Sequence, residues 1–388
     1  MLTGTSLLTG AEAVAHAMRQ IDPDVVPVYP ITPQTPMVEA FAKMVADGAC
    51  RTELVNVESE HSAMSAAVGS ALAGARTITA TSSQGLALMA EVVYIAAAMR
   101  APVVVALGNR ALSGPINIHG DHSDSMLIRD SGVLQLFAES AQEAYDLMIA
   151  APRIAERQDV LLPVFVCQDG FTVTHSAEPV ELLPDEVVDP FVGDYRVPYP
   201  LFDLDRITTQ GPFAMPDSYF EHKRDQELAI EAAILAVADV ADELRELTGR
   251  KIRLVEAYRL EDAERAIVLL GASAGTVKDV VDELRVAGER VGLLRICCYR
   301  PFPNEEIRLA LAGMRTVAVL DRALAPGARP PLLTEVAASL YGSQVRLRSY
   351  VYGLGGRDLF PQDVRRVYAD LTAGGSRRTG YLGLKESS

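Results

Sequence analysis

Glu60 is a candidate for proton transfer, because it follows a strand-like run and begins a helix of small residues. A carboxyl group in a pocket of low dielectric constant can exchange a proton with a ring nitrogen of a bound cofactor, and small neighbours let the ring approach. The alternative is a solvated first-turn glutamate favoured by the helix dipole. Glu58 competes for the same role, because in an extended strand end the two carboxyl groups would face the same way.

Thr32 lies between Ile31 and Pro33, with Pro30 one residue earlier. Proline fixes backbone angles and restricts the residue before it, so this hydroxyl is held in a stiff turn at the end of an apolar strand. A rigid hydroxyl donor suits a ligand. An ordinary proline turn, or the N-cap of the helix that follows, is the competing interpretation.

Arg110 is a lone arginine directly after the most apolar strand of the first half of the chain. A guanidinium group there could form a bidentate pair with a substrate carboxylate, which lysine cannot reproduce geometrically. A structural salt bridge is an equally good interpretation of the residue alone.

Two further loops carry polar groups. Ser83 and Gln84 end another strand and could line the same crevice, but there is no Gly-x-Ser-x-Gly elbow of a hydrolase. His119, Asp121 and His122 lie in a glycine-broken loop rather than on one helix face, and no further ligand is evident, so we expect no metal there. We expect this loop to close over a substrate or to contact a partner.

Composition narrows the class of protein. The 388 residues are 49% hydrophobic, which predicts a globular protein of two or three domains. A formal charge of -15 disfavours nucleic acid and anionic membranes as partners. We expect no signal peptide or membrane span; Thr9-Gly10-Ala11-Glu12 is instead typical of a capping box. Four cysteines without disulfide or iron-sulfur spacing indicate the cytoplasm and no cluster on this chain.

The elements that must position these residues alternate between apolar β-branched runs and alanine-rich helical stretches through about residue 170. This pattern predicts an α/β fold with a doubly wound parallel sheet covered on both faces. The expected strands are 25–29, 52–57, 77–81, 102–107 and 162–166, and the expected helices are 35–46, 59–72, 86–99 and 141–157. Ligands of such sheets bind at the carboxyl ends of the strands, where every residue singled out above lies.

The second half predicts a smaller α/β domain. Prolines are frequent over 179–216, which indicates either an ordered excursion that meets a neighbouring chain or a plain linker. A helix over 226–247 follows, and then strands at 266–271, 291–296 and 316–321 alternate with helices at 276–287, 304–311 and 332–341. The expected division is a first domain over 1–245, a second over 260–365 and a C-terminal tail over 366–388.

Tyr-Pro-Ile-Thr-Pro, Glu-Ser-Glu-His-Ser-Ala, Thr-Ser-Ser-Gln-Gly-Leu, Gly-Asn-Arg-Ala and His-Gly-Asp-His-Ser-Asp occur in this order. Together with Asp321-Arg322-Ala323 and the run from Gly353 to Asp358 they resemble the α subunit of 2-oxoacid:ferredoxin oxidoreductases, pyruvate branch. The resemblance implies that the first domain is the pyrimidine-binding domain of the thiamine diphosphate fold and that the second is similar to the C-terminal domain of transketolases.

The resemblance also implies roles. Glu60 would activate the pyrimidine, Thr32 and Arg110 would hold the 2-oxoacid, and Pro30, Ile31, Ser83 and Gln84 would line the cofactor. The Gly-Asp-Gly…Asn-Asn pattern that grips the diphosphate through a metal is missing, so thiamine diphosphate would be shared with a β subunit that carries Mg²⁺ and a [4Fe-4S] cluster. Further γ and δ subunits, ferredoxin and coenzyme A would complete the system.

Alternative functions remain open at this stage. The substrate could be 2-oxobutyrate, 2-oxoglutarate or oxalate, although the extra cations that the last two would need are not visible. The chain could instead belong to a non-redox thiamine diphosphate decarboxylase or transketolase-like enzyme. A third possibility is a scaffold chain that only organises a complex.

Overall fold

The computed structural model describes residues 4–373 and 378–385. Its first half is built on a parallel sheet in the order β12-β6-β7-β5-β4, extended by β2-β3 through an isolated bridge between Val25 and Thr77. All neighbours in this sheet run parallel except β12, which is antiparallel to β6. Its strands are β2 (Val25–Val28), β3 (Glu53–Asn56), β4 (Ile78–Thr81), β5 (Val104–Asn109), β6 (Leu134–Phe137), β7 (Val164–Asp169) and β12 (Cys298–Arg300).

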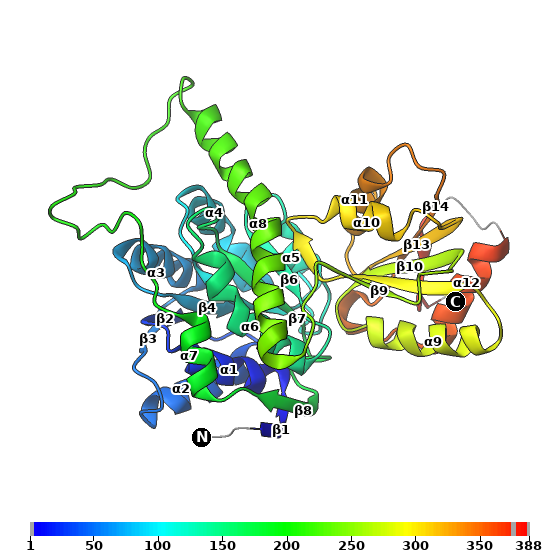
Figure 1. Ribbon diagram of the computed structural model, residues 1–388, viewed down its shortest axis with the longest axis horizontal. Helices are drawn as coiled ribbons and strands as arrows, with labels where there is room; N and C mark the ends of the chain where they lie inside the picture. Colours follow the sequence, from blue (N-terminus) through cyan, green and yellow to red (C-terminus); the bar gives the residue numbers. More distant parts are fainter. Residues whose placement is uncertain (1–3, 374–377, 386–388) are drawn as a thin grey trace.

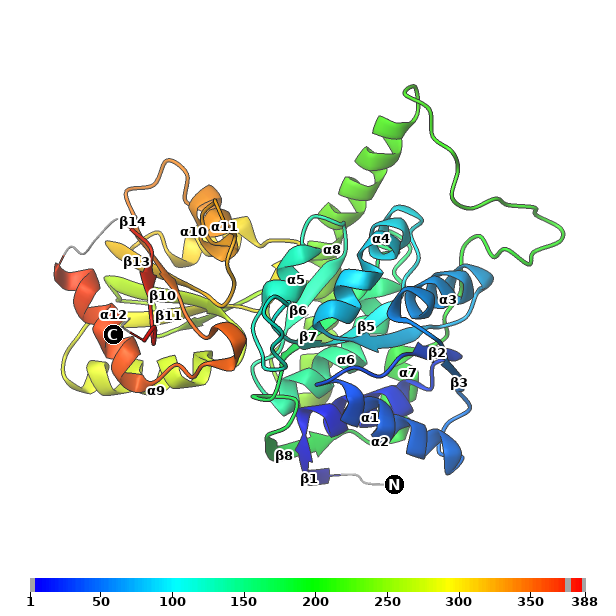
Figure 2. The ribbon, with the colours of Figure 1, turned by 180° about the vertical axis from the view of Figure 1, so that it is seen from behind.

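Helices cover this sheet on both faces, as Figure 2 shows. One face carries α3 (Glu60–Ala73), α4 (Ser83–Ala98) and the short α5 (Ser123–Leu127), and the other carries α6 (Ala141–Ala155), on which α1 (Gly10–Ile21) packs, and α2 (Thr35–Ala46). A separate antiparallel pair joins β1 (Gly4–Thr9) to β8 (Ala177–Leu182). The doubly wound α/β prediction is therefore confirmed, because helices cover both faces of the sheet and every residue of β4, β5, β6 and β7 is buried.

The second domain is a smaller α/β sandwich with the sheet order β15-β14-β13-β10-β11-β9, parallel except for β9. In Figure 1 its helices α9 and α12 lie below the sheet and α10 and α11 above it. The strands are β9 (Val255–Tyr258), β10 (Arg265–Leu270), β11 (Val291–Ile296), β13 (Thr316–Asp321), β14 (Arg346–Val351) and β15 (Gly380–Tyr381). The helices are α9 (Ala274–Val286), α10 (Asn304–Ala310), α11 (Pro331–Ser339), the 3-10 turn η1 (Leu354–Gly356) and α12 (Pro361–Ala373).

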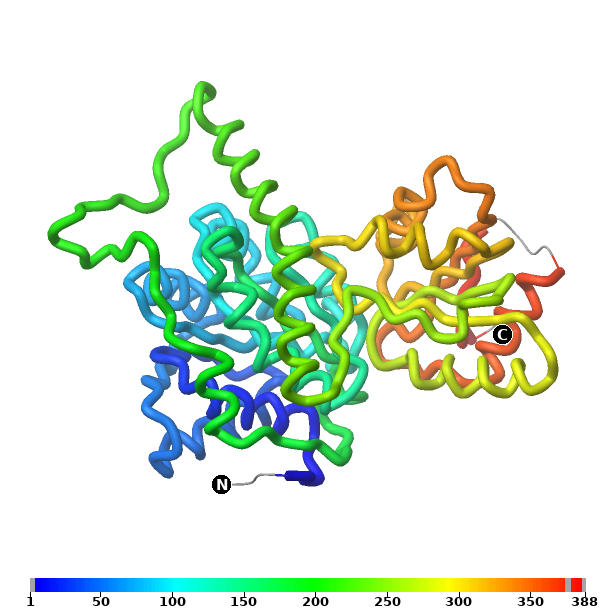
Figure 3. Tube along the Cα trace, viewed as in Figure 1, coloured from blue at the N-terminus to red at the C-terminus, as the bar shows by residue number. Residues whose placement is uncertain are grey.

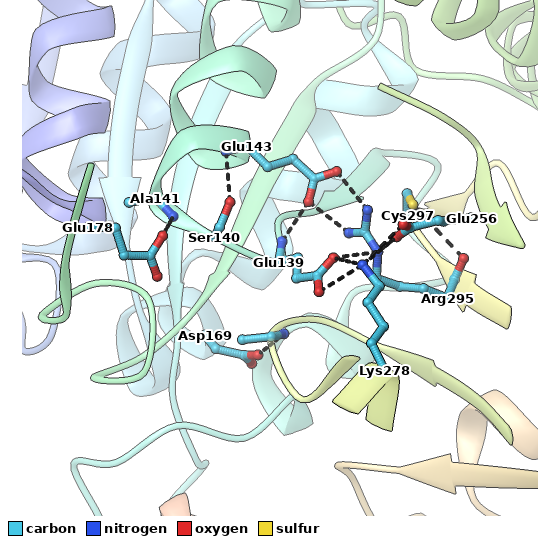
Figure 4. Close-up of polar contacts among 11 residues, drawn as sticks. Glu139, Ser140, Ala141, Glu143, Asp169, Glu178, Glu256, Lys278, Arg295 and Cys297 are labelled. Carbon is cyan, nitrogen blue, oxygen red and sulfur yellow. Dashed lines mark hydrogen bonds and ion pairs between the residues drawn. The ribbon is translucent and has the colours of Figure 1, made fainter. Parts of the chain in front are cut away.

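The two domains share a strand and a buried charge cluster. Strand β12 follows β11 of the second domain yet pairs with β6 at the edge of the first sheet. Arg295 of β11 is buried and binds Glu143 of α6 at 2.7 Å and Glu256 of β9 at 2.7 Å. Lys278 of α9 binds Glu139, just before α6, at 2.7 Å, as Figure 4 shows. These contacts join elements of both domains.

The region 179–216 is more structured at its start than the sequence indicated. Strand β8 and helix α7 (Asp185–Val192) occupy it up to residue 192. Residues 194–218, which we call the arm, then run without helix or strand to α8 (Tyr219–Thr248) and project from the body in Figures 1 and 3. The proline-rich composition predicted the irregular arm but hid the short elements before it.

Two other expectations need correction. Several strands were not predicted, because short runs interrupted by polar residues have no clear period. They are β1, β6, β8, β9, β12, β14 and β15. Residues 366–373 belong to α12, and Gly380–Tyr381 pairs with β14, so the described part of 366–388 is part of the second domain and not a tail. Among the described helices, none combines the length and hydropathy needed to cross a membrane.

Candidate functional site

The loops at the carboxyl ends of the parallel strands converge on one place in the first domain. Thr32 follows β2, Glu60 follows β3, Ser83 follows β4 and Arg110 follows β5. An ideal Cβ on Gly108 of β5 would lie 3.2 Å from Ser82 Oγ and 3.3 Å from Pro33 Cγ. The sheet therefore brings together residues that are far apart in the sequence, as open parallel sheets do at their ligand sites.

Glu60 is the first residue of α3, behind the N-cap Ser59, and only 6% of its surface is exposed. Its side chain reaches the first turn of α4, where a Cβ on Gly85 would lie 2.7 Å from Glu60 Oε1. Within the described part of the chain, its carboxyl group has no hydrogen-bond or ion-pair partner. Glu58 is exposed and accepts a hydrogen bond of 2.5 Å from Ser62 Oγ. The two carboxyl groups therefore do not share one environment, contrary to the expectation from an extended strand.

Several buried polar atoms around this place have no hydrogen-bond partner among the described residues. They are Gln34 Oε1, Thr81 Oγ1, Ser82 Oγ and Asn109 Oδ1. Thr81 Oγ1 would lie 2.6 Å from a Cβ on Gly85, next to the Glu60 carboxyl group. A buried polar group without a partner is costly, so such a cluster fits a ligand that has several polar atoms. The residues present therefore fit one side of a thiamine diphosphate site.

Arg110 is 6% exposed, and its guanidinium group donates to the carbonyl oxygens of Asn117 at 2.8 Å and Thr32 at 2.9 Å. No carboxylate of the described chain pairs with its side chain, so the salt-bridge interpretation is wrong. Thr32 is exposed and does not cap α2, whose N-cap is Gln34. The arginine and threonine are thus tied to each other and retain polar groups for a ligand.

Ser83 is buried and holds a strained backbone, with φ at 45°. Its hydroxyl donates to the Ala111 carbonyl oxygen at 2.5 Å, and its own amide donates to Asp124 Oδ2 at 3.0 Å. Its hydroxyl is thus bound within the protein. Gln84, beside it, is half-buried.

The loop with His119, Asp121 and His122 lies against the second domain of the same chain. Gly355 of η1 donates its amide to Asp121 Oδ2 at 3.1 Å, and His119 packs on Gly356. His122 is 1% exposed and bonds Asp169 Oδ1 at 2.7 Å. Across the described residues, no three His, Cys, Asp or Glu side chains are grouped to hold a metal ion.

Sequence reasoning assigned no role to Asp124, Asp169 or Arg322, although all three are buried. Asp169, at the end of β7, pairs with His122 and with Arg322 Nη1 at 3.0 Å and accepts the Ala272 amide at 2.7 Å. Burial alone would raise the pKa of Asp169, but Arg322 and His122 outweigh it and hold this pKa well below the ordinary value. The sequence does carry one signal for Asp124, because it is the second aspartate in the short polar loop that follows the strand ending at Asn109.

Comparison with known families agrees with this site. Residues 16–242 match the family described as "Pyruvate flavodoxin/ferredoxin oxidoreductase, thiamine diP-bdg", which defines the class of the first domain as thiamine diphosphate-binding. Residues 263–364 match "Pyruvate:ferredoxin oxidoreductase core domain II". The chain therefore belongs to the pyruvate:ferredoxin oxidoreductase family.

Two curated relatives cover nearly the whole chain. It is 56% identical to the pyruvate synthase subunit PorA of Thermotoga maritima, over 98% of both chains. It is 46% identical to PorA of Methanocaldococcus jannaschii, again over 98% of both. These relatives also bear out the predicted resemblance to the pyruvate branch.

A solved structure of the 2-oxoglutarate:ferredoxin oxidoreductase from Magnetococcus marinus, with 2-oxoglutarate, coenzyme A and succinyl-CoA bound, has a similar fold. The TM-score is 0.76 at 19% identity, over 95% of this chain and 66% of that one. At this identity the likeness concerns the fold alone.

Proposed function

We propose that this chain is the α subunit of an enzyme that oxidatively decarboxylates pyruvate with coenzyme A to acetyl-CoA, carbon dioxide and reduced ferredoxin, or runs the reverse reaction. The proposal is supported by the pyruvate synthase subunits that match 98% of the chain. The observation that carries it is the buried, unpartnered Glu60 carboxyl group beside the side chain-free Gly85.

Thiamine diphosphate, when bound, supplies a nucleophilic thiazolium carbon and accepts the electrons released by decarboxylation. Glu60 would hold the pyrimidine ring through a shared proton, and its burial would strengthen that hydrogen bond. The side chains of Thr81, Ser82 and Asn109, whose oxygens have no partner among the described residues, and the Pro30–Gln34 turn would lie beside that ring. Ser83 and Gln84 shape the wall of the same pocket.

Arg110 and Thr32 hold the substrate. The guanidinium group is fixed by two carbonyl oxygens and directs its other N–H groups to the pyruvate carboxylate. The Thr32 hydroxyl, on a turn tied to Arg110, donates to the neighbouring 2-oxo oxygen. These two contacts orient the 2-oxo carbon of the substrate. The chain therefore contributes to catalysis by positioning the substrate and by transferring a proton.

The partners in this proposal are a β subunit with the Mg²⁺-diphosphate site and a [4Fe-4S] cluster, γ and δ subunits, and ferredoxin, all in the cytoplasm. Four cysteines without disulfides support a reducing compartment. The arm supports a contact with a neighbouring chain, because it exposes large apolar side chains such as Phe202, Leu204 and Phe213.

The test is Glu60→Gln in the assembled complex, with Glu58→Gln as the matched control. We expect the first change to lower kcat for pyruvate by about 10²- to 10⁴-fold, because the amide cannot exchange the proton. The control should change kcat less than about twofold, because surface substitutions are usually mild. The measurement is pyruvate-dependent and coenzyme A-dependent reduction of ferredoxin or a viologen dye. Unchanged oxidation by Glu60→Gln would exclude the assigned role.

The same assay identifies the preferred 2-oxoacid substrate. Turnover of pyruvate, 2-oxobutyrate, 2-oxoglutarate and oxalate by the wild-type complex should be highest with pyruvate. Higher kcat/KM for any of the others would replace pyruvate in the proposal, and dye reduction absent with all four would favour a non-redox enzyme.

A further inference from the structure

Asp124 is completely buried in α5 and accepts hydrogen bonds from three separate segments of the first domain. Its Oδ2 accepts the backbone amides of Ser83 at 3.0 Å and Arg110 at 2.9 Å. Its Oδ1 accepts the Asn109 side-chain amide at 2.9 Å and the Ser125 amide at 2.7 Å. All four partners are donors, so the geometry calls for an acceptor on both oxygens, which an ionised carboxylate provides.

These bonds join the loops that follow β4 and β5, in addition to the hydrogen bond from the Ser83 hydroxyl to the Ala111 carbonyl oxygen at 2.5 Å. The Ser83 loop ends β4 and the Arg110 loop ends β5, and both reach the same oxygen of Asp124. Arg110 in turn holds the Thr32 carbonyl oxygen through Nη1. Asp124 therefore contributes to the spacing between the start of α4, which faces Glu60, and Arg110, because one of its oxygens binds the backbone of both loops.

We propose that Asp124 is a positioning residue for the reaction, which places Arg110 and the start of α4 for simultaneous contact with substrate and cofactor. This inference rests on the proposed function, since it deepens the roles of Arg110 and Glu60. Asp124 itself touches neither ligand. Hydrogen bonds from a fixed second layer hold such groups within a few tenths of an ångström, and small displacements there are costly for catalysis.

The rival explanation is a purely structural buried aspartate. Asp146 of α6 is a matched control, because it is 3% exposed and also joins distant segments through two hydrogen bonds from Arg250, at 2.7 and 2.8 Å. It lies in the charged cleft beside α6, away from Glu60 and Arg110. Asp124→Asn and Asp146→Asn therefore remove the same charge at comparable burial, and only the first disturbs the site loops.

The experiment measures both variants in the complete complex. An asparagine at 124 directs an amide N–H₂ at two N–H donors, so two of the four hydrogen bonds are lost. We expect Asp124→Asn to raise KM for pyruvate by about ten- to a hundredfold, with kcat changed less than KM. The amides of Ser83 and Arg110 should exchange hydrogen faster than in the wild type. Asp146→Asn should lower the thermal midpoint without moving KM or those two amides.

Two results would overturn the inference. One is an assembled Asp124→Asn complex with wild-type KM and wild-type exchange at Ser83 and Arg110. The other is an equal rise in KM in Asp146→Asn. If the wild-type complex does not oxidise pyruvate, the proposed function fails, while the exchange of the two amides still tests whether Asp124 holds the loops.

A measurement on the wild type covers the case in which Asp124→Asn does not assemble. Burial raises the pKa of Asp124 to about 6, against the hydrogen bonds from Asn109, Arg110 and Ser83 that lower it. Asp121, Arg110 and Cys167 are the charged or titratable groups that interact with it. We expect KM for pyruvate to rise as the pH falls below about 6, because protonation removes one acceptor. The measurement should cover roughly pH 5 to 8, because a group with a pKa of about 6 titrates over this range. A KM that does not change over this range would contradict the inference.

Discussion

At the residue scale, Glu60 and Glu58 lie only two positions apart but have different environments. Glu60 starts α3 and turns inward against α4, whereas Glu58 precedes the helix and stays exposed on Ser62. Helix geometry alone produces this result, because the strand period of two ends at the N-cap Ser59. A family resemblance had favoured Glu60, and its burial supports that choice independently.

Gly85→Ala tests how closely α4 must approach Glu60. The new Cβ would lie 2.6 Å from Thr81 Oγ1 and 2.7 Å from Glu60 Oε1, so the carboxyl group must move. We expect kcat/KM for pyruvate to fall by about ten- to a hundredfold. Steady-state kinetics of the complex is the measurement.

Gly69→Ala in α3 is the control for Gly85→Ala. Nothing lies within 4 Å of the Cβ that it would add, so we expect a gain of about 0.5–1 kcal/mol from helix propensity and unchanged kinetics. Equal kinetic loss in both variants would show that the effect belongs to helices in general and not to the approach of α4 to Glu60.

At the element scale, the helix starts decide where side chains enter the site. Capping sites are local in sequence, and for that reason the Thr9-Glu12 capping box was predictable and is confirmed at α1. Strand ends are local too, so the loops after β2 to β5 were identified correctly. Elements that need a distant partner, such as β12 on β6, were not, because a three-residue strand has no period of its own.

Thr9→Ala tests the capping box. Thr9 Oγ1 accepts the Glu12 amide at 3.2 Å, and its own amide donates to Glu12 Oε2 at 2.8 Å. Loss of the hydroxyl should lower the free energy of unfolding by about 1 kcal/mol and leave pyruvate oxidation unchanged. Glu12→Gln keeps an acceptor for the Thr9 amide and should cost less. Thermal unfolding of the complex measures both, and an equal loss in the two variants would contradict the assigned geometry.

At the scale of the whole molecule, the second domain contacts the loops of the candidate site through Asp121 and Asp169. Asp169 ends β7, next to Gly170, whose Cβ would lie 2.3 Å from the Asn109 carbonyl oxygen. The same carboxylate binds Arg322 and the Ala272 amide of the second domain. The Asn117–Asp124 loop therefore lies between the loops of Ser83 and Arg110 on one side and η1 on the other.

Asp169→Asn tests this junction. Removing one member of a buried ion cluster should lower the free energy of unfolding by about 3–5 kcal/mol at neutral pH. Because the folded-state pKa is lowered, the stabilisation is present above the unfolded-state value of about 4 and is lost as the pH falls further toward the folded-state value. The difference in stability between wild type and variant should therefore shrink in acid. Denaturant unfolding at several pH values is the measurement.

Asp130→Asn serves as the control at the surface. Asp130 is 67% exposed and lies 3.6 Å from Arg300, so its loss should have little effect at any of these pH values. A pH-independent difference for Asp169→Asn would mean that the lost contact is not ionic.

The sequence by itself determined the α/β class, the order of the main elements and the loops that carry Thr32, Glu60, Ser83 and Arg110, because hydrophobic period, caps and turn residues act over a few positions. Only the tertiary structure decided that Glu60 is buried without a partner among the described residues, that Arg110 holds Thr32, and that Asp124 and Asp169 join loops from distant strands. The physical reason is that burial and hydrogen-bond partners depend on which strand ends become neighbours in the sheet, and residues separated by tens of positions leave no local pattern of that proximity.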